Sequence, residues 1–423
     1  MNIPANESAA DRAARHELLR AARAAGLDVT GGILRRTSSR FCFGVEHGDY
    51  NGTELFGVGT DRFLWLAAKP NGTDQVRVAS ANFPADGVMT FRPGATPPPR
   101  APALADHFGR FVAGADFVLR RAGHATARGF DAALFGNIPG GGMSRSASLT
   151  INLLLTMLDL NGLRPRNDWD VIEMAQAVET DYIGSPCGQL DQIMIYFARA
   201  GMGTHYTPRT RAIRHIPLGP AAPDFRILSL DTGTVRPGLE KSTYKIRRAE
   251  CEELLALTRE EFGLSCLADV RDPAVYERML SRHGAAHPHL CARLKYLFAA
   301  QQRFADLLAA WTAGDLPAVG RIFRADGLGL RDDYQISGPE LETMCDIVRT
   351  VPGVLGERML GGGDKGAAGA LALAEAAPAV RAAVAEAYPR SRPHLADRYA
   401  VHECRMVDGV VSLAPPEETG VGA

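Results

Sequence analysis

The feature that most constrains this chain is a glycine- and serine-rich segment, Asn137–Ser148 (NIPGGGMSRSAS), which comes directly before an apolar run with helical spacing. Three consecutive glycines leave backbone N–H groups bare, so these groups can converge on an anion at the start of a helix, where the helix dipole attracts phosphate. The segment is neither the GxxxxGK(S/T) loop nor a GxGxxG loop. Taken alone, it is explained as well by a tight turn as by a ligand site.

Two other segments carry polar groups that suit a site beside a bound phosphate. Arg40–Asn51 (RFCFGVEHGDYN) packs two carboxylates, a histidine, a tyrosine and an arginine into an otherwise apolar and glycine-rich stretch, which suits the binding of sugar hydroxyls. Ala175–Gln192 carries Glu179 on a predicted helix and Asp191 after a Gly-Ser-Pro-Cys-Gly turn. Each carboxylate alone is best interpreted as a surface charge or a helix cap. Together with the glycine-rich segment, they indicate a functional site.

The length of 423 residues predicts two domains of mixed helix and strand. The composition changes at Pro217–Pro223 (PLGPAAP), which is followed by an alternating run, Phe225–Leu230, so we place the boundary near residue 220 and expect domains of 1–220 and 221–423. Periodicity predicts helices over 7–26, 104–122, 147–160, 243–259 and 289–313, strands over 130–135 and 225–230, strand and turn structure over 56–69, and a proline-rich surface connection over 93–102.

Charge and cysteine usage exclude several classes of function. Lys and Arg total 47 against 48 Asp and Glu, so nothing in the overall charge predicts binding to nucleic acid or to an anionic membrane. The seven cysteines are scattered and never spaced as CxxC, which argues against a disulfide framework or a zinc ribbon and fits a reducing cytoplasm. The first thirty residues do not have the apolar stretch of a signal peptide, and no apolar run reaches membrane-spanning length. We therefore expect a cytoplasmic protein with a small-molecule substrate.

Six segments resemble, in collinear order, the galactokinases of the GHMP kinase superfamily. The family patterns GRxNxIGEHxDYNGG, PxGxGLSSSAS, AExxFxGxPCGxxDQ, NVRHxLxxSxYxxRRxxCE, LRDDYxVSxPELD and MTGGGFGG correspond to Ser39–Gly52, Pro139–Ser148, Val178–Gln192, Thr234–Glu252, Leu330–Glu342 and Met359–Gly366. This resemblance implies a two-domain α+β protein with the GHMP kinase fold. Its N-terminal domain would be ribosomal-S5-like and its C-terminal domain ferredoxin-like, with the active site in the cleft between them.

The resemblance also implies ATP and Mg²⁺ as cofactors and assigns roles to residues. Asp191 matches the catalytic base that faces the anomeric hydroxyl of the sugar, and Arg40 matches the arginine beside it. Ser146 and Glu179 match the ligands of Mg²⁺, which as a hard cation prefers oxygen. The remaining matches are the sugar contacts Glu46, His47, Asp49 and Tyr244, and the phosphate-loop residues Gly140, Gly141, Gly142, Ser144, Arg145 and Ser146.

The chain departs from the family pattern at several positions around these residues. Between Pro139 and Ser146 the phosphate loop is one residue shorter, and Arg145 replaces a serine, so its side chain either contacts phosphate or points to solvent. The other departures are Cys42 for Asn, Gly44-Val45 for Ile-Gly, Pro237 for His and Asp364-Lys365 for Phe-Gly.

The departures spare Arg40, Ser146, Glu179 and Asp191, a distribution that favours an altered substrate over lost activity. They lead to the hypothesis of a sugar 1-kinase that acts on a longer or already phosphorylated sugar, such as a heptose or octose derivative of an antibiotic pathway, with Arg145 or Lys365 as anion contacts. A true galactokinase and a non-catalytic sensor that binds sugar and ATP are the alternatives.

Overall fold

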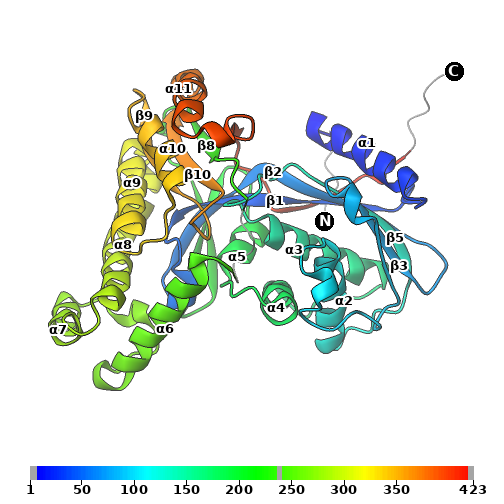
Figure 1. The fold of residues 1–423 in the computed structure, drawn as a ribbon, viewed down its shortest axis with the longest axis horizontal. Helices are drawn as coiled ribbons and strands as arrows, with labels where there is room; N and C mark the ends of the chain where they lie inside the picture. The colour runs from blue at the N-terminus through cyan, green and yellow to red at the C-terminus, as the bar shows by residue number, and fades with distance from the viewer. Residues whose placement is uncertain (1–6, 236–240, 418–423) are drawn as a thin grey trace.

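The computed structural model describes residues 7–235 and 241–417, which form two β-sheets and the helices that cover them (Figure 1). The strands are β1 Ile33–Gly44, β2 Leu55–Pro70, β3 Val76–Ser80, β4 Val88–Phe91, β5 Phe130–Gly136, β6 Met202–Thr207, β7 Ala212–Pro217, β8 Phe225–Asp231, β9 Val354–Met359, β10 Ala367–Leu373, β11 Ala400–Cys404 and β12 Val410–Leu413. The α-helices are α1 Ala9–Ala24, α2 Gly109–Arg121, α3 Arg145–Leu160, α4 Asp168–Ala177, α5 Leu190–Tyr196, α6 Thr243–Phe262, α7 Pro273–His283, α8 Pro288–Ala313, α9 Leu316–Asp332, α10 Pro339–Arg349 and α11 Ala377–Ser391.

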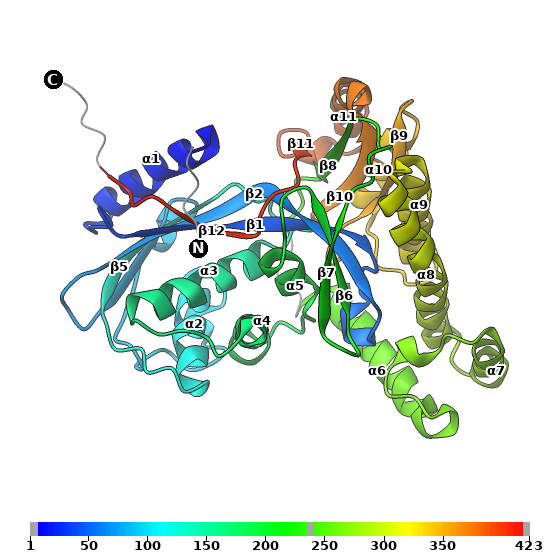
Figure 2. The same ribbon diagram turned by 180° about the vertical axis from the view of Figure 1, so that it is seen from behind.

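The larger sheet has the strand order β12-β1-β2-β5-β3-β4, and β6 extends it from β2 and carries β7. The long strands β1 and β2 are its antiparallel backbone, while β3 and β5 run parallel. Helix α1 covers one face, where Leu18 packs in one core with Trp65, and helices α2 to α5 cover the other (Figures 1 and 2). Because both faces are covered, most of the side chains of β1 and β2 are buried on both sides.

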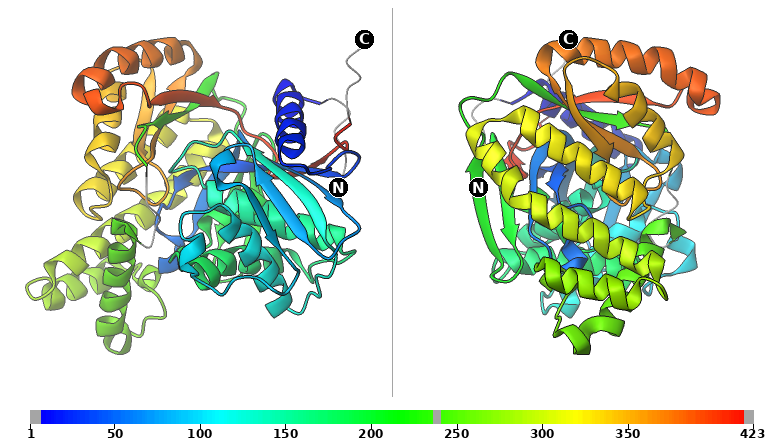
Figure 3. Two further views of the ribbon diagram at one scale, coloured as in Figure 1. Left: turned by 45° about the vertical axis from the view of Figure 1, so that its right-hand side comes forward. Right: turned by 90° about the vertical axis from the view of Figure 1, so that its left-hand side faces the viewer.

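The smaller sheet is antiparallel, with the order β11-β8-β10-β9, and helices α9, α10 and α11 pack against it (Figure 3). The two sheets share one continuous core. Phe41 of β1 stacks on Phe323 of α9 with ring centroids 5.3 Å apart, and Phe43 lies 5.2 Å from Trp311 of α8. The division near residue 220 stays a prediction. After the smaller sheet the chain returns to the larger one, where β12 pairs with β1 from Leu34 opposite Leu413.

Most of the elements predicted from periodicity are confirmed, with shifts at their ends. Helix α1 begins after Ser8, whose hydroxyl accepts the N–H of Asp11, and it ends before Gly26, where φ is +65°. Helix α2 begins only at Gly109, because the three residues from Pro102 form a separate 3-10 turn. Residues 56–69 were expected to contain a turn and instead lie in the single strand β2.

Several chain segments that are distant in sequence meet at one place between the sheets. They are the end of β1 with the turn that follows it, the loop before α3, the starts of α5 and α6, and the glycine turn between β9 and β10. In residues 7–235 and 241–417 no helix is both long and apolar enough to span a membrane.

Candidate active site

The place where these segments meet is a cavity of about 450 Å³. All the site residues predicted from the sequence line it: Arg40, Glu46, His47, Asp49, Gly140, Gly141, Gly142, Ser144, Arg145, Ser146, Glu179, Asp191 and Tyr244. The structure therefore brings all of these residues together in one cavity. Their individual roles remain predictions.

The glycine loop reaches the cavity because it packs against a second glycine turn. A Cβ on Gly142, where φ is +83°, would lie 3.0 Å from the carbonyl oxygen of Ala367, and a Cβ on Gly366 would lie 2.8 Å from backbone atoms of Gly141. Side chains at these positions would push the two turns apart. The bare backbone of the loop is thereby held at the start of α3.

The first turn of α3 has the features of an anion site. Ser144 precedes the helix in the left-handed region, with φ at +63°, and its side chain makes no capping hydrogen bond. Its Oγ is buried and has no hydrogen-bond partner among the residues that the structure describes. An oxyanion at this position would receive that hydroxyl and the uncapped N–H groups of the helix.

Arg40 and Asp191 form the central ion pair of the cavity. Arg40 Nε donates to Asp191 Oδ1 at 2.8 Å, and Nη1 donates to the carbonyl oxygen of Gly142 at 2.9 Å. The third donor, Nη2, lies 3.2 Å from Oε1 of Glu46. Although burial acts to lower it, the pKa of Arg40 is raised above its ordinary value because Asp191 and Glu46 face it. Arg40 is thus a fixed cation, whereas the Asp191 side chain is one-third exposed to the cavity.

The predicted sugar contacts are buried and strongly held. Asp49 Oδ2 accepts the N–H of Leu190 at 3.0 Å, and burial raises the pKa of Asp49. The ring of Tyr244 lies 5.2 Å from that of His47, whose Nδ1 pairs with the hydroxyl of Tyr50 at 2.9 Å. These contacts keep the rings and the carboxylate at the cavity wall.

Glu46 differs from the other predicted sugar contacts because both of its carboxylate oxygens are already engaged. Oε1 faces Arg40, and Oε2 accepts a hydrogen bond from Nη2 of Arg358 at 2.9 Å. Burial raises the pKa of Glu46, and the two guanidinium groups act against that rise. The sequence reasoning missed Arg358, which stands directly before the glycine motif Met359–Gly366 and lies far from Glu46 along the chain.

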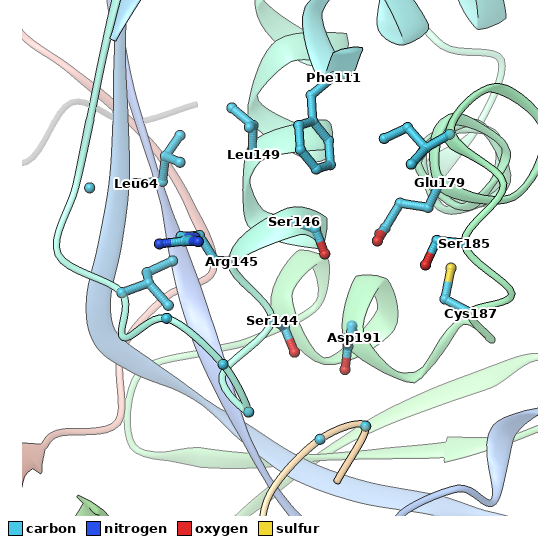
Figure 4. A pocket seen from close by; sticks show the side chains of 18 of the residues that line it. Leu64, Phe111, Ser144, Arg145, Ser146, Leu149, Glu179, Ser185, Cys187 and Asp191 are labelled. Carbon is cyan, nitrogen blue, oxygen red and sulfur yellow. The ribbon is translucent and has the colours of Figure 1, made fainter. Parts of the chain in front are cut away.

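Ser146 and Glu179 lie side by side on the opposite side of the α3 start from Arg145 (Figure 4). Burial raises the pKa of Glu179 to about 7, the hydroxyl of Ser146 bonds to its carboxylate and acts against the rise, and the nearby Asp191 adds to it. Gln192 Nε2 donates to Glu179 Oε1 at 3.0 Å. A buried carboxylate beside a hydroxyl and a second carboxylate fits a hard divalent cation that keeps water and phosphate oxygens as its other ligands. The described residues contain no cluster of three His, Cys, Asp or Glu side chains that could hold a metal on their own.

The part of the cavity beyond Ser146 is apolar and was missed by the sequence reasoning. Figure 4 shows Leu64, Phe111 and Leu149 on this side, away from Asp191, and we call it the apolar part. Its wall also includes Phe83, Phe108, Leu134, Phe135 and Ile138. These residues come from two strands, two helices and the connections between elements, and they share no motif, so only the fold brings them together.

The departures from the family pattern lie mostly away from this cavity. Cys42 does not line it and is buried in an apolar cluster with Leu190, Ile193 and Met194. Asp364 accepts hydrogen bonds from Thr243 at the start of α6 and does not line the cavity, and neither does the exposed Lys365. Val45 is buried in the main core, and Pro237 lies outside the described residues.

Arg145 is the exception among these departures, because it lines the cavity. Its guanidinium lies 5.6 Å from the ring centroid of Phe83, beside the apolar part. Figure 4 shows it directed away from Ser146, Glu179 and Asp191.

Comparison with known proteins gives one consistent picture. The profile of the family described as GHMP kinases N terminal domain matches residues 110–199. A galactokinase of Chloroflexus aurantiacus is 31% identical over 374 residues, which cover 87% of this chain and 88% of the relative. A galactokinase of Streptomyces coelicolor is 32% identical over 340 residues, which cover 80% and 84%.

Solved structures agree with the sequence relatives. The crystal structure of Lactococcus lactis galactokinase complexed with galactose superposes with a TM-score of 0.84 at 25% identity, over 95% of this chain and all of that one. The mevalonate kinase of Methanococcus jannaschii superposes with a TM-score of 0.58 at 13% identity, over 89% and 99%, and shares the fold.

Proposed function

Because the chain belongs to the galactokinase family of the GHMP kinases, we propose that it transfers the γ-phosphoryl group of ATP to the anomeric hydroxyl of galactose. Membership of the family makes it a sugar kinase that uses ATP. The proposal that the phosphoryl group goes to the anomeric hydroxyl depends on one observation. Arg40 and Asp191 are in contact beside an anion site at the start of α3.

Phosphoryl transfer needs positioned reactants, neutralised oxygen charge and a group that removes the proton of the attacking hydroxyl. In our proposal Asp191 accepts that proton. Arg40, fixed by Asp191, Glu46 and the loop carbonyl of Gly142, keeps Asp191 oriented and stabilises charge on the transferring group. The glycine loop and the N–H groups of α3 hold the phosphates, and the apolar part of the cavity takes the nucleoside.

The metal requirement follows from the donor set at the start of α3. We infer that Ser146 and Glu179 hold Mg²⁺, because a buried carboxylate beside a hydroxyl fits this ion. When bound, Mg²⁺ supplies positive charge to the phosphate oxygens of ATP. Gln192 orients Glu179 toward that position.

Galactose is the substrate that the cavity supports best. The residues matched to sugar contacts are all retained at its wall, whereas Cys42 and Lys365, two of the substitutions that suggested a longer or phosphorylated sugar, do not line it. Arg145 does line it, but on the nucleoside side of Ser146. A heptose or octose derivative remains the competing substrate, and the assay below separates the two.

The test is a panel of sugars and sugar phosphates with ATP and Mg²⁺, scored by ADP release and by the position of the new phosphate. We expect galactose to give the highest kcat/KM and a 1-phosphate product. A larger or phosphorylated sugar that is turned over faster would overturn the choice of galactose. Binding of sugar and ATP without turnover of any sugar would show that the chain is a sensor.

The role of Asp191 is tested separately with Asp191→Asn, which keeps the size of the side chain and removes its basicity. General-base catalysis contributes about 10²-fold or more, so kcat should fall by at least that factor while the KM for ATP changes little. A variant that keeps turnover within about tenfold of the parent would contradict the assignment.

A further inference from the structure

The guanidinium of Arg358 is buried and links the ion pair of the active site to the smaller sheet. Arg358 lies on β9, and Nη2 donates both to Glu46 Oε2 at 2.9 Å and to the carbonyl oxygen of Cys42 at 2.8 Å. Glu46 in turn faces Arg40, which holds Asp191. The catalytic pair is therefore connected by side chains to a strand of the other sheet.

The connected groups alternate in charge. Beyond Arg358 the chain of contacts continues to Asp326, whose Oδ2 lies 3.9 Å from Arg358 Nη1, and from Asp326 to Arg303 at 2.6 Å. Counted from Asp191, three carboxylates alternate with three guanidinium groups, so the formal charges cancel. Glu46, Arg358 and Asp326 are almost fully buried, and an uncompensated charge at any of them would be costly.

Arg40 contacts two carboxylates at once, so Glu46 competes with Asp191 for its guanidinium. Its Nη2 lies 2.7 Å from Oδ1 of Asp191 and 3.2 Å from Oε1 of Glu46. If Glu46 had no other cation, it would draw Arg40 toward itself and away from Asp191. Arg358 supplies that other cation.

The remaining groups around Glu46 do not provide a substitute for Arg358. Asp49 and Asp191 face it with like charge, and Cys42 is a buried thiol. The hydroxyl of Tyr296 on α8 donates to the backbone oxygen of Glu46 at 2.8 Å and leaves the carboxylate untouched. Nε and Nη1 of Arg358 have no hydrogen-bond partner in the described part of the chain, so its hydrogen bonds all go through Nη2 toward Glu46 and Cys42.

We propose that Arg358 is a positioning residue for the phosphoryl transfer: by holding Glu46 from the smaller sheet, it leaves Arg40 in its contact with Asp191. The inference rests on the proposed function, since it assumes that Arg40 and Asp191 perform the chemistry. A residue of the smaller sheet would then help to position the groups of the sugar site.

The test compares three variants: Arg358→Met, which removes the charge; Arg358→Lys, which keeps it without the two-pronged contact; and Arg324→Met as the control. Arg324 on α9 pairs with buried Glu357, the neighbour of Arg358 on β9, and has no contact with Glu46. Loss of a hydrogen bond to a charged group costs about tenfold to 100-fold, so Arg358→Met should raise the KM for sugar and lower kcat by such factors. The KM for ATP should stay within about twofold.

A purely structural role would give a different pattern. It would lower the melting temperature and the fraction of active enzyme equally in Arg358→Met and Arg324→Met, and it would leave the KM for sugar unchanged. Partial recovery of the KM for sugar in Arg358→Lys supports positioning through charge. Equal KM values in Arg358→Met and the parent would overturn the proposal.

A crystal structure of a variant decides the inference without any turnover. In Arg358→Met, or in Arg358→Lys if the methionine variant does not fold, Arg40 should turn toward Glu46 and Nε should leave hydrogen-bond range of Asp191 Oδ1. A retained distance of 2.8 Å would overturn the inference. Absence of turnover of every sugar by the parent would instead refute the proposed function, and the two failures are thereby distinguished.

Discussion

Glu179→Gln should make the ligand-free protein more stable and less active, and the gain in stability should grow with pH. Burial raises the pKa of Glu179 to about 7 from an ordinary value of 4.5. Below pH ~4.5 both the folded and the unfolded chain carry the proton, and the carboxyl group costs nothing. Between pH ~4.5 and ~7 only the unfolded chain loses it, so stability falls with rising pH and then stays lower by about 3 kcal/mol.

The substitution removes this penalty because a neutral amide replaces the carboxyl group. The amide oxygen can still accept the hydrogen bond from Gln192, and its N–H can donate to the hydroxyl of Ser146, so no new buried group is left unpaired. The expected gain is about 1 kcal/mol near pH 5.5 and about 3 kcal/mol near pH 8.5. For a chain of 423 residues these values correspond to shifts in Tm of roughly 1 °C and 3 °C.

The measurement is Tm by circular dichroism from about pH 5.5 to 8.5, with Glu173→Gln as the control because Glu173 is an exposed carboxylate of α4. A variant whose Tm advantage is flat or shrinks as pH rises would refute the reasoning. Adding ATP and Mg²⁺ gives a second check, because a carboxylate that binds the metal gains stability from ligand that an amide cannot. The parent should therefore recover most of the difference.

Three further substitutions test the cavity and the residues packed behind its wall. In Gly188→Ala the new Cβ would lie 1.9 Å from Asp49 Oδ2, so the KM for sugar should rise by about tenfold or more while the KM for ATP is unchanged. Tyr334→Phe removes the hydroxyl that lies 2.7 Å from that of Tyr50, which should cost about 1 kcal/mol of unfolding free energy in a urea titration. Arg145→Ser should raise the KM for ATP by about threefold to tenfold and leave that for sugar unchanged, and the reverse pattern would place Arg145 at the sugar.

The members of the site could be predicted from the sequence because each lies in a short motif, but its connections could not. Arg40 and Asp191 stand far apart in the chain, and the motifs bring both to one cavity without showing that Arg40 is shared with Glu46. Arg358 was missed because its partner Glu46 lies far away in the sequence, in the turn that follows a strand of the other sheet. Long-range pairing of buried charges is set by how the sheets pack, and local periodicity carries no information about it.

Helix and strand positions were predictable where apolar spacing was strong, and their ends were less so. Helix α3 begins at Arg145, earlier than the apolar spacing indicates, because the left-handed Ser144 turns the chain out of the glycine loop. The return of β12 to β1 had no local signal, since a strand of four residues is short and its pairing lies at the other end of the chain.

The departures from the family pattern show why distance along a motif is a poor guide to distance from a ligand. Cys42 is only two residues from Arg40 and lies on the same face of β1, yet α5 covers it with Leu190 and Ile193, so its change from Asn reaches the packing under the site and not the cavity wall. Lys365 follows the glycine turn that touches the loop, but its side chain is exposed outside the cavity. Of the described substitutions that suggested a different sugar, Arg145 reaches the cavity, and it does so beside the apolar part. Because none of the departures in the described residues lines the cavity on the sugar side, galactose is the sharper expectation.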